Sequence, residues 1–350
     1  MSLFDRDRSQ HTLPVSVITG FLGSGKTTLL RQLLRQPAAA DTAVVINEFG
    51  EVGLDHLLVE RVDGETVVLQ SGCICCTIRS DLETTLRSLL ARRDAGTVPP
   101  FRRIAIETTG LADPAPILQL LLHNPLVAQF LRLDAAIATV DAVHAERHCA
   151  EMPEASKQVA VADRLILTKT DIVAPEAADR AEALLRALNP AAPIFRVVHG
   201  EIAGDHLFDA GPFDPSGKGE AVRAWLSADA YAATSHRSHA HDRSRHGTDI
   251  RAVALTADRP LDWLALQGWL ARLRRDHGDK LLRAKGLASV AGEDGPLVLH
   301  GVHHVFHPPV ALDRWPDADR RTRLVLIVKD LDPAEAAAGW DAIAAAPASG

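Results

Sequence analysis

The strongest constraint on the fold of this chain is a short glycine-rich run, Gly20-Phe-Leu-Gly-Ser-Gly-Lys26-Thr27. It fits the pattern G-x-x-x-x-G-K-[ST], in which backbone N–H groups close around phosphate oxygens. The apolar run Leu13–Thr19 before it predicts a buried strand, and the stretch from Lys26 to about Gln36 predicts a helix. Since the motif requires a strand before it and a helix after it, we expect a phosphate-binding loop at a helix N-terminus.

Individual residues of this loop have predicted roles. Lys26 supplies a point charge for the β- and γ-phosphates, and the Thr27 hydroxyl is a ligand for Mg²⁺. A carboxylate at the end of another buried strand should meet the same ion, and Glu107 is the candidate, with a helix cap or a surface ion pair as its alternative role. The residues predicted to contact the phosphates are Gly20, Gly23, Ser24, Gly25, Lys26, Thr27, Thr28 and Gly110, and the predicted catalytic residues are Lys26, Thr27 and Glu107.

A second loop, Leu165-Ile-Leu-Thr-Lys-Thr-Asp171, is predicted to read the nucleotide base. The Asp171 carboxylate can accept hydrogen bonds from guanine N1–H and from its exocyclic amine, a pair of donors that adenine lacks. Lys169 would cover the base with its aliphatic stem. Such loops usually read Asn-Lys-x-Asp, and Thr168 stands here in place of the asparagine. GTP is therefore favoured over ATP, with looser base selection because of Thr168; the alternative is an ordinary loop with a Lys–Asp pair.

Three of the four cysteines lie within four residues, at Cys73, Cys75 and Cys76. Thiolates bind Zn²⁺, Cu(I) or Co²⁺, and three protein ligands with an open fourth position suit an ion that is passed on. In an extended stretch Cys73 and Cys75 point the same way, whereas Cys76 needs the chain to turn. Buried inert cysteines and a redox dithiol formed by Cys73 and Cys76 are the alternatives. Cys149 stands alone and is predicted to be a small core residue.

Strand-like and helix-like runs alternate through the first ~200 residues, which predicts an α/β fold with a mostly parallel sheet covered by helices on both faces. Each motif above lies at the end of a predicted strand, where ligands bind in such folds. A capping box at Ser80–Glu83 is predicted to open a helix that runs to about Arg93. Further strands are predicted at 43–46, 66–69, 104–106, 135–140, 165–167 and 194–198, and a further helix at 114–122.

The pattern changes after about residue 208, where breaker residues and a polar tract begin. A second unit follows, with strand-like runs at 251–255, 281–290, 297–306 and 323–328 and a helix at 261–276, which predicts a small α+β domain. The predicted organisation is a tail at 1–12, a P-loop GTPase domain at 13–210, a flexible histidine-containing linker at 211–248 and an α+β domain at 249–345.

Composition and charge argue against nucleic-acid and membrane partners. The net charge of −7 argues against a sequence-independent nucleic-acid binder. No apolar run reaches the roughly 18 residues that a membrane helix needs. The first residues are charged and lack the apolar segment of a signal peptide, so we expect a cytoplasmic protein without nucleic-acid or membrane partners.

Histidines gather in two places. One group lies in the predicted linker and comprises His236, His239, His241 and His246. Weak metal scavenging and a plain polar linker explain this group equally well. The other group lies around the predicted strand 297–306 and comprises His300, His303, His304 and His307. Strand alternation would divide it between two faces, so surface or client-contact roles are favoured over a second metal site.

Together these motifs resemble the CobW-like family of metal-handling GTPases, which is related to the hydrogenase and urease nickel-insertion GTPases. The resemblance spans nearly the whole chain. Its most specific element is the Cys-x-Cys-Cys run between the phosphate loop and Glu-Thr-Thr-Gly. The matching segments are Gly20–Thr27, Ile46–Asp55, Gly72–Cys76, Glu107–Pro114, Thr168–Asp171 and Leu282–Gly286.

The resemblance implies a GTPase that loads Zn²⁺ or Co²⁺ onto a client protein. It further implies that segment 47–55 acts as a switch and that Glu48 helps to hold metal or Mg²⁺, with a solvated loop carboxylate as the alternative role. GTP and Mg²⁺ would order this switch and bring the cysteines into metal-binding geometry, and hydrolysis would release the ion. Slow intrinsic turnover is expected because no glutamine or arginine finger is evident.

Two other functions stay open at the level of the sequence. One is a non-catalytic, metal-responsive regulator that uses GTP only to set its conformation. The other, favoured less, is a P-loop small-molecule kinase, against which the Thr-Lys-x-Asp loop argues. A homodimer is also considered.

Overall fold

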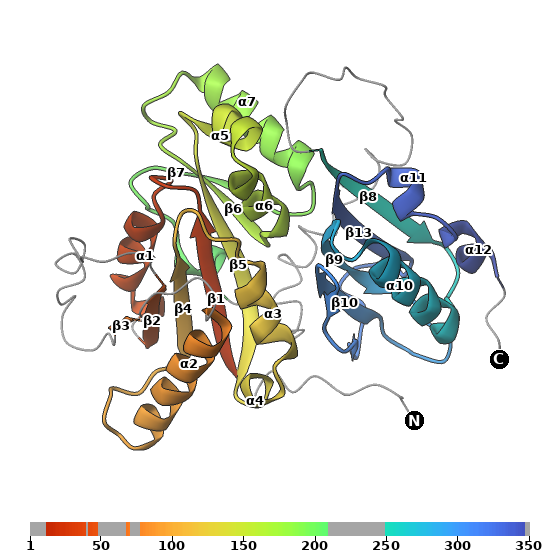
Figure 1. Cartoon of the computed structure of the whole chain (residues 1–350), viewed down its shortest axis with the longest axis horizontal. Coiled ribbons are helices and arrows are strands. Elements are labelled where there is room, and N and C mark those ends of the chain that lie inside the picture. Colours follow the sequence, from red (N-terminus) through yellow and green to blue (C-terminus); the bar gives the residue numbers. More distant parts are fainter. Residues whose placement is uncertain (1–11, 40, 48–67, 71–77, 209–248, 347–350) are drawn as a thin grey trace.

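The computed structural model describes residues 12–39, 41–47, 68–70, 78–208 and 249–346. Figure 1 shows two parts, which we call the P-loop part (residues 12–208) and the C-terminal part (residues 249–346). The predicted linker at 211–248 and residues 1–11 of the predicted tail lie outside the described residues. The proposed domain boundaries therefore stay a prediction.

Within the described residues, the P-loop part contains a parallel sheet in the order β3-β2-β4-β1-β5-β6-β7. Its central strand β1 is flanked by β4 and β5, and all three are apolar because helices cover both faces of the sheet. The strands are β1 (Leu13–Gly20), β2 (Thr42–Asn47), β3 (Val68–Gln70), β4 (Arg103–Thr108), β5 (Leu131–Asp141), β6 (Arg164–Thr168) and β7 (Ile194–Val197).

The helices of the P-loop part divide between the two faces of this sheet. Helix α1 (Lys26–Leu34) packs through Leu29, Leu30 and Leu33 against Ile18 on one face. On the other face, α2, α3 and α6 pack against Val15 and Val17, and α5 and α7 continue the layer beside β6. The bounds are α2 (Ile78–Asp94), α3 (Ala115–His123), α4 (Pro125–Ala128), α5 (Ala145–Glu151), α6 (Pro153–Val161) and α7 (Pro175–Leu188). The predicted α/β class is confirmed.

The C-terminal part is an antiparallel sheet in the order β11-β10-β9-β13-β8, with β12 paired to β10. Helices α10, α11 and α12 cover one face of it, where the rings of Trp269 and Trp340 meet at 5.0 Å. The predicted small α+β domain is thus confirmed. The elements are β8 (Ile250–Ala257), α10 (Trp263–His277), β9 (Leu281–Ala288), β10 (Leu297–Val302), β11 (Val305–Phe306), β12 (Val310–Ala311), β13 (Thr322–Lys329), α11 (Pro333–Ala336) and α12 (Trp340–Ala345).

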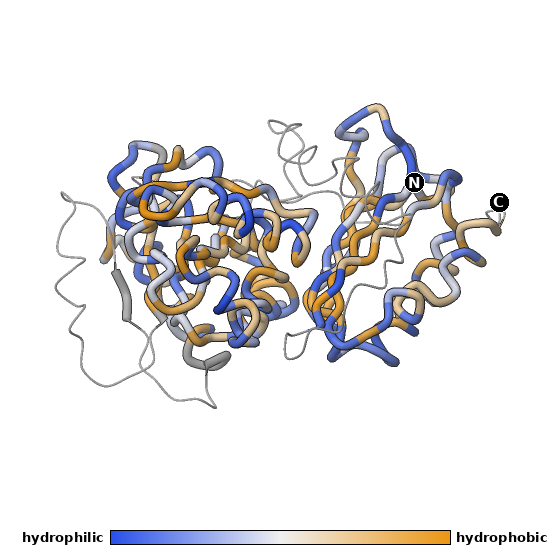
Figure 2. Tube along the Cα trace, turned by 90° about the horizontal axis from the view of Figure 1, so that it is seen from above, coloured by the Kyte–Doolittle hydropathy of each residue, from blue (hydrophilic) through white to orange (hydrophobic). Residues whose placement is uncertain are grey.

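Strand alternation makes the second sheet apolar on both faces. Leu324, Leu326 and Val328 of β13 pack with α10, whereas Val325 and Ile327 belong to the same core cluster as α3 and α6 of the P-loop part. Figure 2 shows hydrophobic segments running along these strands, which lie between the P-loop part and the outer helices. The two parts therefore share buried apolar surface, a favourable contribution to their association.

Two local predictions were wrong. Helix α2 begins at Ile78, so Ser80 lies within its first turn and not at the N-cap position. The Glu83 carboxylate accepts a hydrogen bond from Asn124 Nδ2 at 2.8 Å. The strand predicted at 297–306 is a hairpin, because β10 ends at Val302 and His303 takes a positive φ of 53°. Among the described residues, no helix has the length and apolar character needed to cross a membrane.

Candidate functional site

The phosphate loop joins β1 to α1 at the carboxyl edge of the parallel sheet. Gly20, Gly23 and Gly25 all have positive φ, at 140°, 70° and 95°, which residues with a Cβ rarely adopt. Gly25 is the N-cap of α1, and no side chain occupies the cap position. The amides of the first helical turn are thus left for another acceptor, as an anion site requires.

Lys26 is held against the backbone of the loop that it follows. Its Nζ donates to the Gly20 carbonyl at 2.9 Å and to the Phe21 carbonyl at 3.2 Å, and the residue is 9% exposed. The ammonium is therefore fixed beside the phosphate cradle, where it can neutralise an anion. Its predicted role at the β- and γ-phosphates stays a prediction.

Thr27 and Glu107 meet although they come from different elements. The Thr27 hydroxyl, in the first turn of α1, donates to Glu107 Oε1 at 2.6 Å, and Glu107 is 4% exposed near the end of β4. A hydroxyl and a carboxylate are hard oxygen donors of the kind that Mg²⁺ prefers. The donor set fits the predicted magnesium site.

Gly110 follows Glu107 in a segment that touches the phosphate loop directly. A Cβ at Gly110 would lie 2.6–2.8 Å from the side chain and backbone of Leu22, so only glycine allows this approach. Gln158 of α6 holds the segment from the other side, because its Nε2 donates to the Gly110 carbonyl at 3.1 Å and to the Ala112 carbonyl at 3.0 Å. Gly110 therefore lies against the phosphate loop, and its predicted approach to the γ-phosphate stays a prediction.

The buried Thr168 side chain supports the backbone of the phosphate loop. It is 6% exposed, and its hydroxyl lies 2.8 Å from the Ser24 carbonyl and 3.1 Å from the Val140 carbonyl, both of them acceptors. The Ser24 hydroxyl adds a second tie, at 2.6 Å from Thr139 Oγ1 on β5. The residue that replaces the usual asparagine thus supports the loop backbone.

The predicted base-reading residues lie beyond β6. Lys169 has a positive φ of 59°, and its Nζ forms a 2.7 Å ion pair with the buried Asp141 carboxylate at the end of β5. Asp171 has a partly exposed side chain, and its Oδ2 lies 4.0 Å from Nε2 of His199, which follows β7. Asp171 is accessible to a ligand, as a base reader must be. Thr28, in the first turn of α1, is also exposed.

The predicted metal ligands fall outside the described residues. They are Glu48, Cys73, Cys75 and Cys76. Among the residues that the structure does describe, no group of three or more His, Cys, Asp or Glu side chains could hold a metal ion. Cys149 is buried, and burial raises the pKa of its thiol to about 12, which confirms the prediction of an inert core residue.

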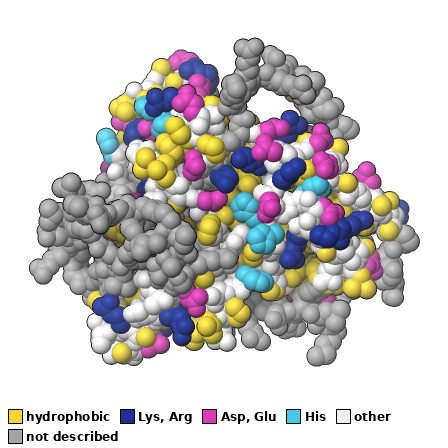
Figure 3. All heavy atoms as spheres, viewed as in Figure 1, with side chains coloured by type: hydrophobic (Ala, Val, Ile, Leu, Met, Phe, Trp, Pro, Cys, Tyr) yellow, Lys and Arg dark blue, Asp and Glu magenta, His cyan; other side chains and the backbone are white. Residues whose placement is uncertain are grey.

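The C-terminal histidines do not share one role. His300 is 2% exposed on β10, so the predicted surface role is wrong for this residue: its strand face packs into the junction of the two parts. His304 is exposed, whereas burial lowers the pKa of both His303 and His307. Figure 3 shows histidine side chains gathered near the centre of the visible face. The linker histidines lie outside the described residues.

Sequence reasoning missed several residues that shape the site. Asp141 and His199 directly follow predicted strands, so the same strand-end rule that found Glu107 could have found them. Gln158 carried no such signal, because it lies mid-helix and acts through contacts with a segment 46 to 48 residues away.

The fold and these contacts define a P-loop nucleotide-binding protein with a second, antiparallel α+β part. Two family models match the chain: the nucleotide-binding domain of CobW/HypB/UreG at residues 14–196 and the C-terminal domain of cobalamin synthesis protein cobW at residues 250–344. The chain belongs to the CobW/HypB/UreG family, and the predicted resemblance is confirmed.

Individual relatives agree with this assignment. Zinc chaperone YjiA of Escherichia coli (strain K12) is 36% identical over 316 residues, which cover 90% of this chain and 93% of YjiA. Zinc chaperone CobW of Pseudomonas aeruginosa is 32% identical over 359 residues, which cover 92% and 89%. The crystal structure of Zn(II)-bound YjiA GTPase matches with a TM-score of 0.68 at 29% identity and covers 95% of this chain and 99% of that chain. The predicted class of enzyme, a GTPase, is confirmed.

Proposed function

We propose that this chain is a GTP-hydrolysing zinc chaperone that binds Zn²⁺ through Cys73, Cys75 and Cys76 and delivers it to a client protein. The observation that carries the nucleotide half is the 2.6 Å contact between the Thr27 hydroxyl and Glu107 at the phosphate loop. The metal half is supported by relatives described as zinc chaperones that align with nine-tenths of this chain. Co²⁺ is the other metal that such thiolates would accept.

Guanine selection is assigned to Asp171. Its carboxylate is accessible at the end of β6, and Lys169 is held beside it by Asp141. Asp171→Asn replaces one carboxylate acceptor by an amide donor, which suits xanthine better than guanine. We expect GTP affinity to fall about tenfold or more and XTP affinity to rise, since a hydrogen bond to a charged group is worth about 1.5–3 kcal/mol. Unchanged GTP affinity would remove Asp171 from the base site.

Hydrolysis follows from the contacts of three side chains. Lys26 lies beside the loop to neutralise phosphate charge, and Thr27 with Glu107 would hold Mg²⁺. The bound ion supplies charge stabilisation for the phosphoryl transfer. The sequence shows no evident arginine finger or water-positioning glutamine, so slow intrinsic turnover is expected.

Segment 47–55 would couple the bound nucleotide to the affinity for metal. Asn47 ends β2 in register with Thr108 of β4, one residue beyond the pair formed by Ile46 and Glu107. Glu48 is the first residue that could respond to Mg²⁺ or to the metal there. A γ-phosphate that orders this segment would raise metal affinity, and hydrolysis would lower it.

The deciding experiment is a Zn²⁺ titration of the full chain, by competition with a chromophoric chelator, in the presence of a non-hydrolysable GTP analogue, GDP or neither. We expect affinity to be about tenfold higher with the analogue than with GDP. Equal affinities in all three states would refute the coupling, because a ligand without differential affinity shifts no equilibrium.

Cysteine variants test the metal ligands in the same assay. Cys73→Ser combined with Cys75→Ser should abolish tight Zn²⁺ binding. Cys149→Ala, which removes the buried thiol outside the Cys73–Cys76 run, is the matched control and should bind as the wild type does. Zn²⁺ binding by the double variant as tight as in the wild type would exclude Cys73 and Cys75 as the zinc ligands.

A further inference from the structure

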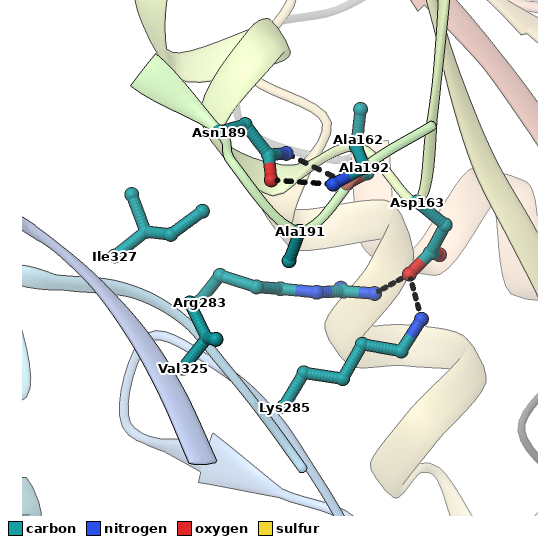
Figure 4. A pocket seen from close by; sticks show the side chains of 9 residues that line it. All are labelled: Ala162, Asp163, Asn189, Ala191, Ala192, Arg283, Lys285, Val325 and Ile327. Carbon is teal, nitrogen blue, oxygen red and sulfur yellow. Dashed lines mark hydrogen bonds and ion pairs between the residues drawn. The ribbon is translucent and has the colours of Figure 1, made fainter. Parts of the chain in front are cut away.

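Asp163 is buried where the two parts of the molecule meet, just beyond the end of α6 (Figure 4). Its Oδ1 accepts hydrogen bonds from Arg283 Nη2 at 2.6 Å and from Lys285 Nζ at 2.8 Å, both on β9. Its Oδ2 accepts from the Ala136 N–H of β5 at 2.9 Å. Asp163, Arg283 and Lys285 are at most 8% exposed and are called the junction ion cluster below.

The junction ion cluster tolerates little displacement. One carboxylate serves two buried cations, and Arg283 Nε and Nη1 have no hydrogen-bond partner among the described residues. If β9 moved away from Asp163, charged groups would be left buried and uncompensated, which is costly in a low-dielectric interior. The ion pairs therefore fix the position of β9 relative to Asp163. A shift of α6 would displace Asp163 and disturb its contacts with β9.

Two polar side chains of α6 reach the segment that lies against the phosphate loop. Gln158, 1% exposed, holds the Gly110 and Ala112 carbonyls, and Lys157 lies 3.2 Å from the Asp113 carboxylate. This is the segment that approaches the phosphate loop at Leu22. One short helix thus connects the segment expected to meet the γ-phosphate with the junction ion cluster.

Helix α3 also connects the Gly110–Asp113 segment with the C-terminal part. Asp113 Oδ1 accepts from the Ala115 N–H at 2.9 Å and so fixes the start of α3. Helix α3 packs against β10 and β11 of the C-terminal part. Helices α3 and α6 therefore each contact both the Gly110–Asp113 segment and the second sheet.

We propose that Gln158 and Asp163 are positioning residues that link the nucleotide site to the C-terminal part through α6. A γ-phosphate that fixes the Gly110–Asp113 segment stabilises the junction ion cluster, and an intact cluster favours GTP over GDP by the same factor, because such coupling is reciprocal. This inference rests on the proposed nucleotide function and adds a route by which the bound nucleotide sets the contact between the two parts.

The test compares affinities of the full chain for a non-hydrolysable GTP analogue and for GDP. In Gln158→Leu and in Asp163→Asn we expect the analogue-to-GDP affinity ratio to fall about fivefold or more, with GDP affinity little changed. Hydrogen exchange at the amides of residues 283–285 should be slower with the analogue than with GDP in the wild type, and equal in the variants. A merely structural role would weaken both nucleotides alike.

Matched variants distinguish a specific loss of coupling from a general loss of folding. Asp179→Asn makes the same change at an exposed carboxylate bound by Arg196 on the surface of α7, and it should keep the wild-type ratio. If Asp163→Asn does not fold, Lys285→Met leaves a one-to-one pair between Asp163 and Arg283 and should lower the ratio, whereas Lys285→Arg should restore it. Folded Gln158→Leu and Lys285→Met variants with the wild-type ratio and exchange difference would overturn the inference. A wild type that binds neither nucleotide would overturn the proposed function first, so the two failures are distinguishable.

Discussion

The Thr27 hydroxyl donates to Glu107 Oε1 at 2.6 Å across 80 residues of sequence. The two meet because β1 and β4 are parallel neighbours, with Ile18 in register with Glu107, so α1 starts beside the end of β4. Parallel pairing thus brings a hydroxyl in the first turn of α1 to a carboxylate on the strand beside β1. This is the arrangement from which a magnesium-assisted reaction can be built.

Glu107→Gln should abolish most GTP hydrolysis while leaving the fold intact. The amide keeps the size of the side chain but removes the negative charge that would balance Mg²⁺, and charge stabilisation by the ion is worth several kcal/mol. We expect turnover to fall about 100-fold or more, with a higher Mg²⁺ requirement, measured by phosphate release across a Mg²⁺ series. Glu182→Gln, at a partly exposed carboxylate paired with Arg186 and Arg196, is the control. Equal turnover in both variants would remove Glu107 from the catalytic residues.

The strand-end motifs could be predicted because each depends on local sequence. The phosphate loop, Glu107 and Asp171 all follow apolar runs, and parallel sheets bring such positions to one edge whatever the strand order. The order β3-β2-β4-β1-β5-β6-β7 itself was not predicted, although it decides that Glu107 is the carboxylate that meets Thr27.

The remaining features depend on contacts that sequence does not display. Gln158 and Asp163 look like ordinary positions in a helix and just beyond its end. Gln158 is buried where it holds the Gly110 and Ala112 carbonyls, and Asp163 is buried at the junction with the second sheet. The histidines at 300–307 were assigned to a continuous strand because apolar periodicity does not show where a hairpin turns. Ser80 matched a capping pattern, but the helix begins two residues earlier.

Thr168→Val should destabilise the phosphate loop. Valine keeps the branched shape but loses the hydroxyl that contacts the Ser24 and Val140 carbonyls in the interior. We expect a loss of about 1 kcal/mol in the free energy of unfolding and several-fold weaker GDP binding, measured by urea titration and fluorescent-nucleotide titration. Thr97→Val, at an exposed hydroxyl bonded to the Arg92 carbonyl, should change neither. Wild-type GDP affinity in Thr168→Val would show that the hydroxyl contacts of Thr168 do not contribute to nucleotide binding.

Two glycine-to-alanine changes should have opposite effects. A Cβ at Gly110 would lie 2.6–2.8 Å from Leu22, so Gly110→Ala should displace the phosphate loop, cost about 1–3 kcal/mol and weaken nucleotide binding. Gly268 lies inside α10 with nothing within 4 Å of the added Cβ, so Gly268→Ala should raise the free energy of unfolding by up to about 1 kcal/mol. Thermal unfolding with and without GDP measures both. A neutral Gly110→Ala would mean that the close approach to Leu22 has no role.

The stability of the chain should fall with acid because of His300. Burial lowers the pKa of this histidine well below its ordinary value; Arg283, Lys285 and His307 lower it further, and Asp163 opposes them. Below the unfolded pKa of about 6.5, His300 therefore binds a proton in the unfolded chain but not in the folded chain. Its contribution to the free energy of unfolding is present above that pH and is lost as the pH falls below it.

His300→Phe tests this dependence, since it replaces a buried neutral ring by an apolar one. Between about pH 6.5 and pH 5 the wild type should lose up to about 1.4 kcal/mol of unfolding free energy per pH unit more than the variant. Arg283 and Lys285 outweigh burial and hold the pKa of Asp163 below its ordinary value. The stability that this carboxylate contributes is therefore lost only beneath about pH 4, and it does not mask the difference. Urea unfolding at a series of pH values gives the slopes, and His304→Phe at an exposed position controls for the loss of a histidine. Parallel slopes for His300→Phe and the wild type would contradict the assignment of a neutral, buried His300 at the junction.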